Sequence, residues 1–162
     1  MPLAEHVIYP DRSESGIWII KESEEEFRSL LDLSELELQE LNRIAWPERR
    51  QQWLSVRWLL HKMSGRVVRA KIDKSNDGQP RLSDSKYSIS LSHSHQYVAA
   101  AAAPFPIGVD IQIKTNRMKR ILKKFATERE LEACHEKNDL NLAHLIWSAK
   151  ECMFKAYAKG CV

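Results

Sequence analysis

The chain has 162 residues, of which 43% are apolar and 29% are charged. These fractions are typical of a folded globular protein and exclude a disordered or fibrous one. The longest apolar run, residues 97–103, is far shorter than the roughly 20 residues that span a bilayer, so no membrane helix is expected. The N-terminus lacks the basic head and apolar core of a signal peptide, which favours a cytoplasmic protein. The 3 cysteines lack CxxC spacing and are expected to be reduced thiols.

Charge is distributed unevenly along the chain. Residues 1–48 hold 4 basic and 12 acidic side chains, whereas residues 49–162 hold 21 basic and 10 acidic ones. Such an asymmetry indicates that the basic part meets an anion, which could be nucleic acid, a phosphorylated small molecule or an acidic protein surface. Aromatic and basic residues do not interleave as they do on nucleic-acid-binding surfaces, so nucleic acid is not an expected partner.

The first part of the chain predicts one strand and two helices. The segment GIWIIK at 16–21 is rich in β-branched and aromatic residues, which favours a strand. Ser34 and Glu37 have the spacing of a capping box, so a helix is predicted to begin there. A second helix begins at Pro47, because proline suits the first helical position, and Gly65 ends it.

Strands dominate the next segment. Strands are predicted at 67–72, 87–91 and 97–103, with a turn at 76–78. The last two strands are predicted to form a hairpin around residues 93–95. The small alanine side chains of 97–103 would allow a helix or a second sheet to pack closely. Pro104 and Pro106 interrupt both helices and ladders, so the boundary between two domains, residues 1–105 and 106–162, is predicted there.

The remaining part predicts a strand, a basic stretch and a long helix. The strand is IGVDIQ at 107–112. Residues 114–124 contain six basic side chains in eleven, and Thr127 with Glu130 has the spacing of another capping box. The last helix is predicted over 141–159. Its predicted apolar stripe comprises Ile146, Ala149, Met153 and Tyr157.

Asp110 is the most informative residue, because a carboxylate inside an apolar strand costs stability unless a cation or a metal pairs with it. Glu151 on the last helix is the natural second carboxylate, and Mg²⁺ is usually held by one or two carboxylates with substrate phosphates and water. Lys150 and Lys155 flank Glu151 as phosphate ligands. The structural alternative is that Glu151 and Lys155 form a surface pair worth ~0.3–0.5 kcal/mol, with Asp110 in water at a sheet edge.

Taken together, these residues form a specific pattern. IGVDIQ at 107–112 is followed by WSAKECMFKAYAKG at 147–160. The pair resembles the signature of the 4′-phosphopantetheinyl transferases, in which a (V/I)G(V/I)D strand precedes a (F/W)SxKExxxK helix. Residues 75–94 resemble the first-half motif of the larger, pseudo-dimeric class that activates surfactin and other peptide synthetases, with Gln79 in place of the usual lysine. The fixed positions present are Gly108, Asp110, Trp147, Ser148, Lys150, Glu151 and Lys155.

The resemblance implies an α+β fold of two similar halves, each a long helix packed on a small antiparallel sheet, with coenzyme A bound between them. It implies Mg²⁺-dependent transfer of the 4′-phosphopantetheine arm from coenzyme A to a serine of an apo acyl or peptidyl carrier protein, releasing 3′,5′-ADP. Relatives continue for several strands beyond the last helix, so the second half is expected to be incomplete. A monomer is expected. The alternative is a truncated, non-catalytic module that binds coenzyme A or the carrier protein.

The resemblance also implies a metal site and its neighbours. Asp110 and Glu151 would hold Mg²⁺ on the pyrophosphate of coenzyme A. Gln112 stands where many relatives have a third carboxylate, so its amide or a water would complete the metal shell. Lys155 would add positive charge at the same phosphates, and Lys150 would assist it.

Other roles follow from the same resemblance. Glu130 matches the family glutamate proposed as the general base for the carrier serine. Its alternative role is the capping box with Thr127, and one rotamer cannot fill both roles. Ser92 and His93 match the pair that contacts the coenzyme A phosphates, and Arg57 would reach the 3′-phosphate end.

Overall fold

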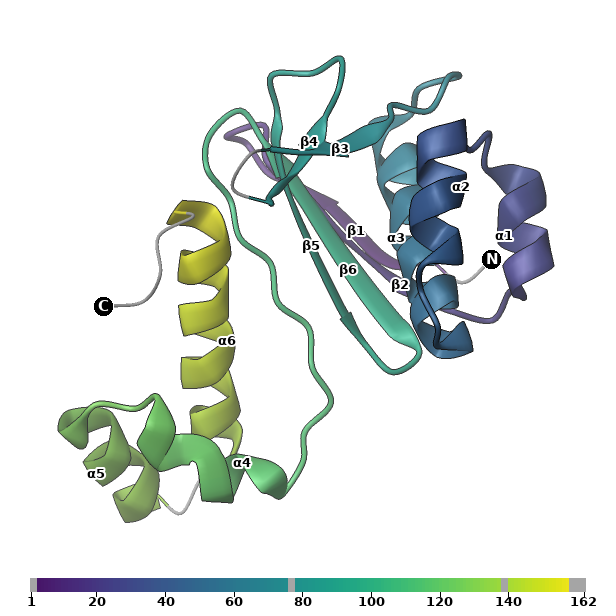
Figure 1. Ribbon diagram of the computed structural model, residues 1–162. Helices are drawn as coiled ribbons and strands as arrows, with labels where there is room; N and C mark the ends of the chain where they lie inside the picture. The colour runs from purple at the N-terminus through teal and green to yellow at the C-terminus, as the bar shows by residue number, and fades with distance from the viewer. Residues whose placement is uncertain (1–2, 76–77, 138–139, 158–162) are drawn as a thin grey trace.

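The computed structural model describes residues 3–75, 78–137 and 140–157, and it confirms the predicted α+β class (Figure 1). One antiparallel six-stranded sheet has the order β1-β2-β6-β5-β4-β3. The strands are β1 (Leu3–Ile8), β2 (Glu14–Ile19), β3 (Ile72–Lys74), β4 (Pro80–Leu82), β5 (Ser88–Ser94) and β6 (Tyr97–Ala103). The helices are α1 (Glu24–Leu30), α2 (Glu35–Asn42), α3 (Pro47–Ser64), α4 (Arg117–Ile121), the 3₁₀ turn η1 (Leu122–Lys124), α5 (Glu128–Lys137) and α6 (Leu140–Tyr157).

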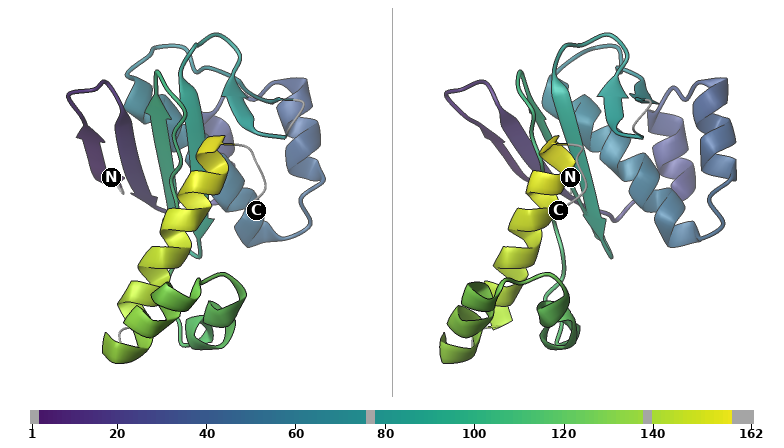
Figure 2. Two further views of the ribbon diagram at one scale, coloured as in Figure 1. Left: turned by 90° about the vertical axis from the view of Figure 1, so that its left-hand side faces the viewer. Right: turned by 60° about the vertical axis from the view of Figure 1, so that its left-hand side comes forward.

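Two helices lie on opposite faces of the sheet. Helix α3 covers one face, and α6 lies on the other side, with a long extended segment between α6 and the sheet (Figures 1 and 2). The main core lies between α3 and the sheet and contains the fully or almost fully buried side chains of Trp18, Leu54, Leu59 and Val98. Alternate strand residues point to this face because a strand has a side-chain period of two.

The helix boundaries follow local sequence signals. The capping box of Ser34 and Glu37 is formed at the start of α2, and α3 begins at Pro47, as predicted. Gly65 ends α3 with a φ of 61°, in the left-handed region that favours glycine. Helix α1 and strand β1 were not predicted. A second capping box, Ser23 with Glu26, marks the start of α1 and was the signal that could have identified it.

The strand predicted at 67–72 is wrong except for its last residue. Strand β3 begins at Ile72, and the side chains of Val67 and Val68 are 98% and 78% exposed. Their β-branched character favours a strand, but the guanidinium of Arg69 binds the carboxylate of Glu37 at 2.6 and 2.9 Å instead. The chain therefore follows α2 before it enters the sheet.

The predicted hairpin is confirmed, and its first strand is longer than expected. Strands β5 and β6 pair from Ser88 opposite Ala103 to Ser94 opposite Tyr97. In the turn predicted at 76–78, Asn76 and Asp77 lie outside the described residues. The alanines of β6 are buried on both faces, so small side chains do permit close packing on the face away from α3.

The second half contains a small helical core. Met118, Leu122 and Ala143, from α4, η1 and α6, are buried together. The strand predicted at 107–112 is wrong: this segment is extended but is not part of the sheet, because its amide groups bond to serine hydroxyls rather than to a strand. Within the described part of 106–162 there is no strand, and the similarity of the two halves stays a prediction.

Helix α6 turns inward a face that shares only Ile146 with the predicted stripe. Met153 and Tyr157 of the predicted stripe are 53% and 69% exposed, whereas Ala143 and His144 are buried. Trp147 packs edge-on against Phe125, with ring centroids 4.8 Å apart. The face of α6 that meets the extended segment carries Ser148 and Lys155, whose side chains bond to Asp110 of that segment. The apolar periodicity therefore does not by itself determine which face of the helix points inward. The helix end predicted at 158–160 lies outside the described residues, and none of the described helices is long and apolar enough to cross a membrane.

Candidate functional site

Asp110 lies at the centre of a polar cluster built by three separate elements. Its Oδ1 accepts hydrogen bonds from the Ser92 hydroxyl of β5 (3.0 Å) and from Lys155 Nζ of α6 (3.1 Å), and its Oδ2 accepts one from the Ser148 hydroxyl of α6 (2.9 Å). Lys155 Nζ also donates to the carbonyl oxygen of Val109 at 2.8 Å. The expected cation partner of Asp110 is therefore Lys155, and the side chain of Asp110 is only 10% exposed.

Gln112 lies beside this cluster and is held through one end of its amide. Its Nε2 donates to the Ser148 hydroxyl at 2.6 Å and to the carbonyl oxygen of His144 at 3.3 Å. Its Oε1 is then the atom that can accept a donor or ligate a cation. Glu151 is half-buried and makes no hydrogen bond or ion pair with the described residues.

Asp110, Gln112 and Glu151 carry oxygen donors that suit a hard divalent cation. Asp110 and Gln112 share the Ser148 hydroxyl as a partner, and Glu151 lies on α6 four residues before Lys155, which binds Asp110. Two carboxylates and an amide oxygen are the ligand chemistry of Mg²⁺. Two of these residues come from the extended segment and one from α6, and Gln112 already bonds to α6 through Ser148. The residues present therefore fit Mg²⁺ as a ligand set.

Lys150 points to a neighbouring group instead of to Asp110. Its Nζ lies 2.7 Å from Glu130 Oε2 and 2.7 Å from the carbonyl oxygen of Phe125. The same Oε2 accepts hydrogen bonds from the backbone N–H (2.7 Å) and hydroxyl (3.0 Å) of Thr127, so the capping box at the start of α5 is formed. The hydrogen bond from Lys150 is the largest cause that holds the pKa of Glu130 below its usual range. All three donors use Oε2, and Oε1 has no hydrogen-bond partner among the described residues.

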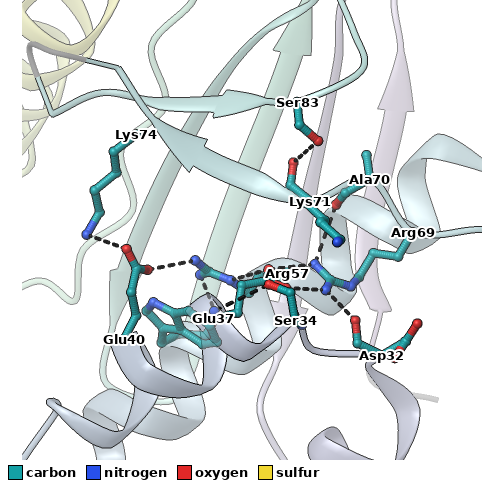
Figure 3. A network of polar contacts seen from close by, with 11 residues as sticks. Asp32, Ser34, Glu37, Glu40, Arg57, Arg69, Ala70, Lys71, Lys74 and Ser83 are labelled. Atoms are coloured by element: carbon teal, nitrogen blue, oxygen red, sulfur yellow. Dashed lines mark hydrogen bonds and ion pairs between the residues drawn. The ribbon is translucent and has the colours of Figure 1, made fainter.

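Arg57 is buried in a network of ion pairs (Figure 3). Its guanidinium lies 3.5 Å from Glu37 and 3.6 Å from Glu40, and it stacks 3.2 Å from the ring centroid of Trp53. Burial lowers the pKa of Arg57 to about 10, although Glu37 and Glu40 oppose that shift. Arg69 completes the network through its two hydrogen bonds to Glu37. The structure therefore places Arg57 against the ring of Trp53 as a paired cation, with its side chain only 5% exposed.

A hollow of about 270 Å³ opens between α3, the β3–β4 hairpin and β5. Two cations that were not predicted, Arg49 and Lys74, line it. Arg49 lies on the same helix as Arg57, and Lys74 precedes the turn that contains Gln79; these positions were the available signals. The lining comprises Arg49, Gln52, Trp53, Val56, Arg57, Ile72, Lys74, Gly78, Pro80, Leu91, Ser92 and His93.

His93 is one of the residues that line this hollow. The residue is exposed overall, but the protein around its ring removes water, and this is the largest cause that lowers its pKa to about 4. The positive charges of Arg49 and Lys155 lower the pKa further, and Asp110 opposes them. The imidazole is therefore neutral near pH 7. The structure brings together Ser92, Asp110 and Lys155 and places His93 beside them.

Gln79 links the β3–β4 hairpin to α6. Its Nε2 donates to the carbonyl oxygen of Lys155 at 2.8 Å. The glutamine that replaces the usual lysine thus contacts the backbone of the residue whose side chain binds Asp110. The hairpin that borders the hollow is thereby tied to the helix that carries the polar cluster.

Two models of related protein families match consecutive parts of the chain. Residues 37–103 match the family model of the 4′-phosphopantetheinyl transferase N-terminal domain, and residues 106–162 match that of the 4′-phosphopantetheinyl transferase superfamily. No curated protein sequence matches the chain. Ser92 lies in the first matched segment, whereas Asp110 and Lys155 lie in the second. Both matches support a transferase and, in general terms, phosphopantetheine transfer.

Proposed function

We propose that the protein transfers the 4′-phosphopantetheine arm of coenzyme A to a serine of an apo acyl or peptidyl carrier protein, with Mg²⁺, and releases 3′,5′-ADP. The observation that carries this proposal is the cluster at Asp110. It joins the two segments matched by the family models through the hydrogen bond from Ser92 to Asp110, and Ser148 and Lys155 of the second segment bond to the same carboxylate.

The hollow beside the cluster has the chemistry that coenzyme A requires. Arg49 gives its lining positive charge, and Lys74, which pairs with Glu40 at 3.3 Å, adds a second cation that suits the 3′-phosphate and the pyrophosphate. The indole of Trp53 supplies an aromatic face on which an adenine ring can stack. Arg57 stacks on that indole and lines the same hollow, and its contact with the 3′-phosphate end stays part of the proposal. The neutral imidazole of His93 can donate one hydrogen bond to a phosphate oxygen.

Asp110, Glu151 and the Oε1 of Gln112 would hold Mg²⁺. When bound, the ion would neutralise charge that develops on the pyrophosphate as 3′,5′-ADP leaves. Lys155 already lies against Asp110 and adds a second positive charge at the same place. Lys150 assists indirectly, because it holds Glu130 next to the C-terminal part of η1.

The transfer itself is a substitution at phosphorus. The serine oxygen of the carrier forms a bond to the phosphorus of the pantetheine phosphate, the bond from this phosphorus to the oxygen of 3′,5′-ADP breaks, and the serine proton goes to a base. Glu130 is proposed as this base through Oε1, because only Oε2 is occupied by Thr127 and Lys150. In this proposal one rotamer serves both the cap and the base, contrary to the expectation from the sequence. Its lowered pKa means that Glu130 is ionised near pH 7, while the hydrogen bonds that lower the pKa also make the carboxylate a weaker base.

Carrier docking is assigned to the basic stretch 114–124. Its charged side chains are exposed, whereas Met118 and Leu122 anchor it in the helical core. Opposite charges on an acidic carrier surface and on this stretch would steer the encounter.

Calorimetric titration with coenzyme A, with and without Mg²⁺, tests the proposal. Two carboxylates leave most of an octahedral shell to phosphate and water, so metal and coenzyme A should each raise the affinity of the other by the same factor. Asp110→Ala and Glu151→Ala should abolish this coupling. Asp84→Ala is the matched control, because Asp84 is an exposed carboxylate paired with Arg66 far along the chain from the cluster. Equal coenzyme A affinity with and without Mg²⁺ in the parent would refute the shared site.

A second assay separates catalysis from binding alone. Labelled coenzyme A is incubated with several apo carrier proteins, and transfer of label to the carrier is measured. Label on the carrier serine supports the transferase. Tight coenzyme A binding without transfer to any carrier would instead establish the non-catalytic binding module.

A further inference from the structure

The extended segment that carries Asp110 is attached to β5 in an unusual manner. Backbone N–H groups of every second residue donate to serine hydroxyls that also occur at every second residue of β5. The three hydrogen bonds run from Val109 to Ser90 (3.0 Å), from Ile111 to Ser92 (3.1 Å) and from Ile113 to Ser94 (3.1 Å). We call this set the serine ladder.

This segment is not held by ordinary strand pairing. Strand β6 pairs with β5 from Ser88 to Ser94, whereas β4 pairs with β5 only at Ser88, opposite Arg81, and the amides of the segment bond to side-chain hydroxyls of β5. The segment instead lies over the face of the sheet that points away from α3, on the side of α6 (Figure 2). An extended chain and a strand share a period of two residues, so hydroxyls at 90, 92 and 94 can meet every second amide of the segment.

The neighbouring strand leaves room for the segment. Ala99 and Ala101 of β6 lie opposite Ser92 and Ser90, so these four side chains share one face. Both alanines are 2% exposed. Larger side chains at these positions would hold the segment away from the sheet and out of reach of the short serine hydroxyls.

The ladder determines where Asp110 lies. The Ser92 hydroxyl accepts from the amide of Ile111 and donates to the carboxylate of Asp110, so it is both part of the ladder and part of the cluster. Ser90 and Ser94 make no hydrogen bond to Asp110 in the described structure; they accept from the amides of Val109 and Ile113 on either side of it. A shift of the segment by one ladder step would move Asp110 by about 6–7 Å, away from Lys155.

We propose that Ser90 and Ser94 are positioning residues: their hydroxyls fix the register of the segment so that Asp110 meets Lys155 and the other oxygen donors of the cluster. The inference about ligand binding rests on the proposed function, but the ladder itself does not. Its first test therefore needs no ligand.

Amide hydrogen exchange of the full chain, followed by NMR, tests the ladder directly. Ser90→Ala should speed exchange at Val109, and Ser94→Ala should speed exchange at Ile113, each by a few fold to about tenfold, because one hydrogen-bond acceptor is lost. Ser88→Ala is the matched control, because Ser88 lies on the same face of β5 and its hydroxyl makes no hydrogen bond in the described structure. Unchanged exchange at Val109 and Ile113 would overturn the ladder.

The second test measures positioning. In Ser90→Ala and Ser94→Ala, the factor by which Mg²⁺ raises coenzyme A affinity should fall, while affinity without metal stays at the parent value. Ser94→Thr should restore the factor, since it retains the hydroxyl at a half-exposed position. Faster exchange with an unchanged metal factor would overturn the positioning role. If the parent itself shows no metal factor, the proposed function fails, and the exchange result still decides the ladder.

Discussion

Substitution of Gly108 by alanine gives the sharpest test of how the site is assembled. A Cβ at this position would overlap the carbonyl oxygen of Cys152 and lie 2.6 Å from its carbonyl carbon and 2.8 Å from its Cα, whereas ordinary contact begins at 3.4 Å. The obstructing atoms belong to the backbone of α6, so no side chain can rotate away. Overpacking typically costs about 1–3 kcal/mol, and a clash with a helix backbone belongs at or above the upper end, at ~3 kcal/mol.

Urea unfolding of Gly108→Ala, Gly65→Ala and the parent measures this cost. Gly65 has open space around its Cβ position, so its substitution costs only the left-handed φ, about 1–2 kcal/mol. Gly108→Ala should lose more free energy of unfolding than Gly65→Ala and should also lose the coupling of Mg²⁺ to coenzyme A, because α6 moves away from Asp110. A loss no larger than that of Gly65→Ala, with normal coupling, would refute the close packing of the segment on α6.

Three further predictions concern Glu130, the basic stretch and Glu37. Glu130→Gln should lower turnover by ~10²–10⁴ if the side chain acts as base. If the side chain only caps α5, the same variant should lose about 1 kcal/mol of stability and keep its turnover. Glu26→Gln is the control, because Glu26 belongs to the capping box of α1 and its loss should change stability alone. Replacement of Lys119, Arg120 and Lys123 by glutamate should raise the KM for the carrier at low ionic strength and leave the KM for coenzyme A unchanged. An unchanged KM for the carrier would show that the basic stretch 114–124 does not dock the carrier. Burial raises the pKa of Glu37, but hydrogen bonds and charge from Arg69 and Arg57 outweigh it, so the folded pKa lies below 4.5. The stabilisation by Glu37 is therefore complete above the unfolded pKa and is lost as the pH falls through the folded one. Unfolding followed from pH 7 to pH 3 should show a shallower acid loss in Glu37→Gln than in the parent, and parallel curves would contradict this assignment.

Local signals in the sequence predicted local structure well. The capping residues of α2, the proline that begins α3 and Gly65 that ends it act within one helical turn, so neighbouring residues suffice to identify them. The segment 107–112 was identified as extended and apolar, but its partners are hydroxyls 19 residues earlier in the chain. Periodicity cannot show whether an extended chain pairs with a strand or lies over a sheet. The prediction of a strand at 107–112 was wrong for that reason.

The same limit applied to the site. Asp110 was singled out because a carboxylate between apolar neighbours needs a partner, and Lys155 is that partner. The burial of Arg57 was not foreseen, because its carboxylate partners lie on α2 and are brought together only by the fold. Arg49 and Lys74 were missed as lining residues because they come from a helix and a hairpin that meet only in three dimensions.

The position of Asp110 depends on contacts from both sides at once. The serine ladder fixes the segment on the sheet, and the absent side chain of Gly108 brings it against α6. Either constraint alone would leave one set of partners out of reach, because Ser92 belongs to β5 whereas Ser148 and Lys155 belong to α6. The serines of β5 and Gly108 therefore act together to position Asp110. They hold its carboxylate between the core of the sheet and the helical core of α4, η1 and α6, where a bound ligand would contact both.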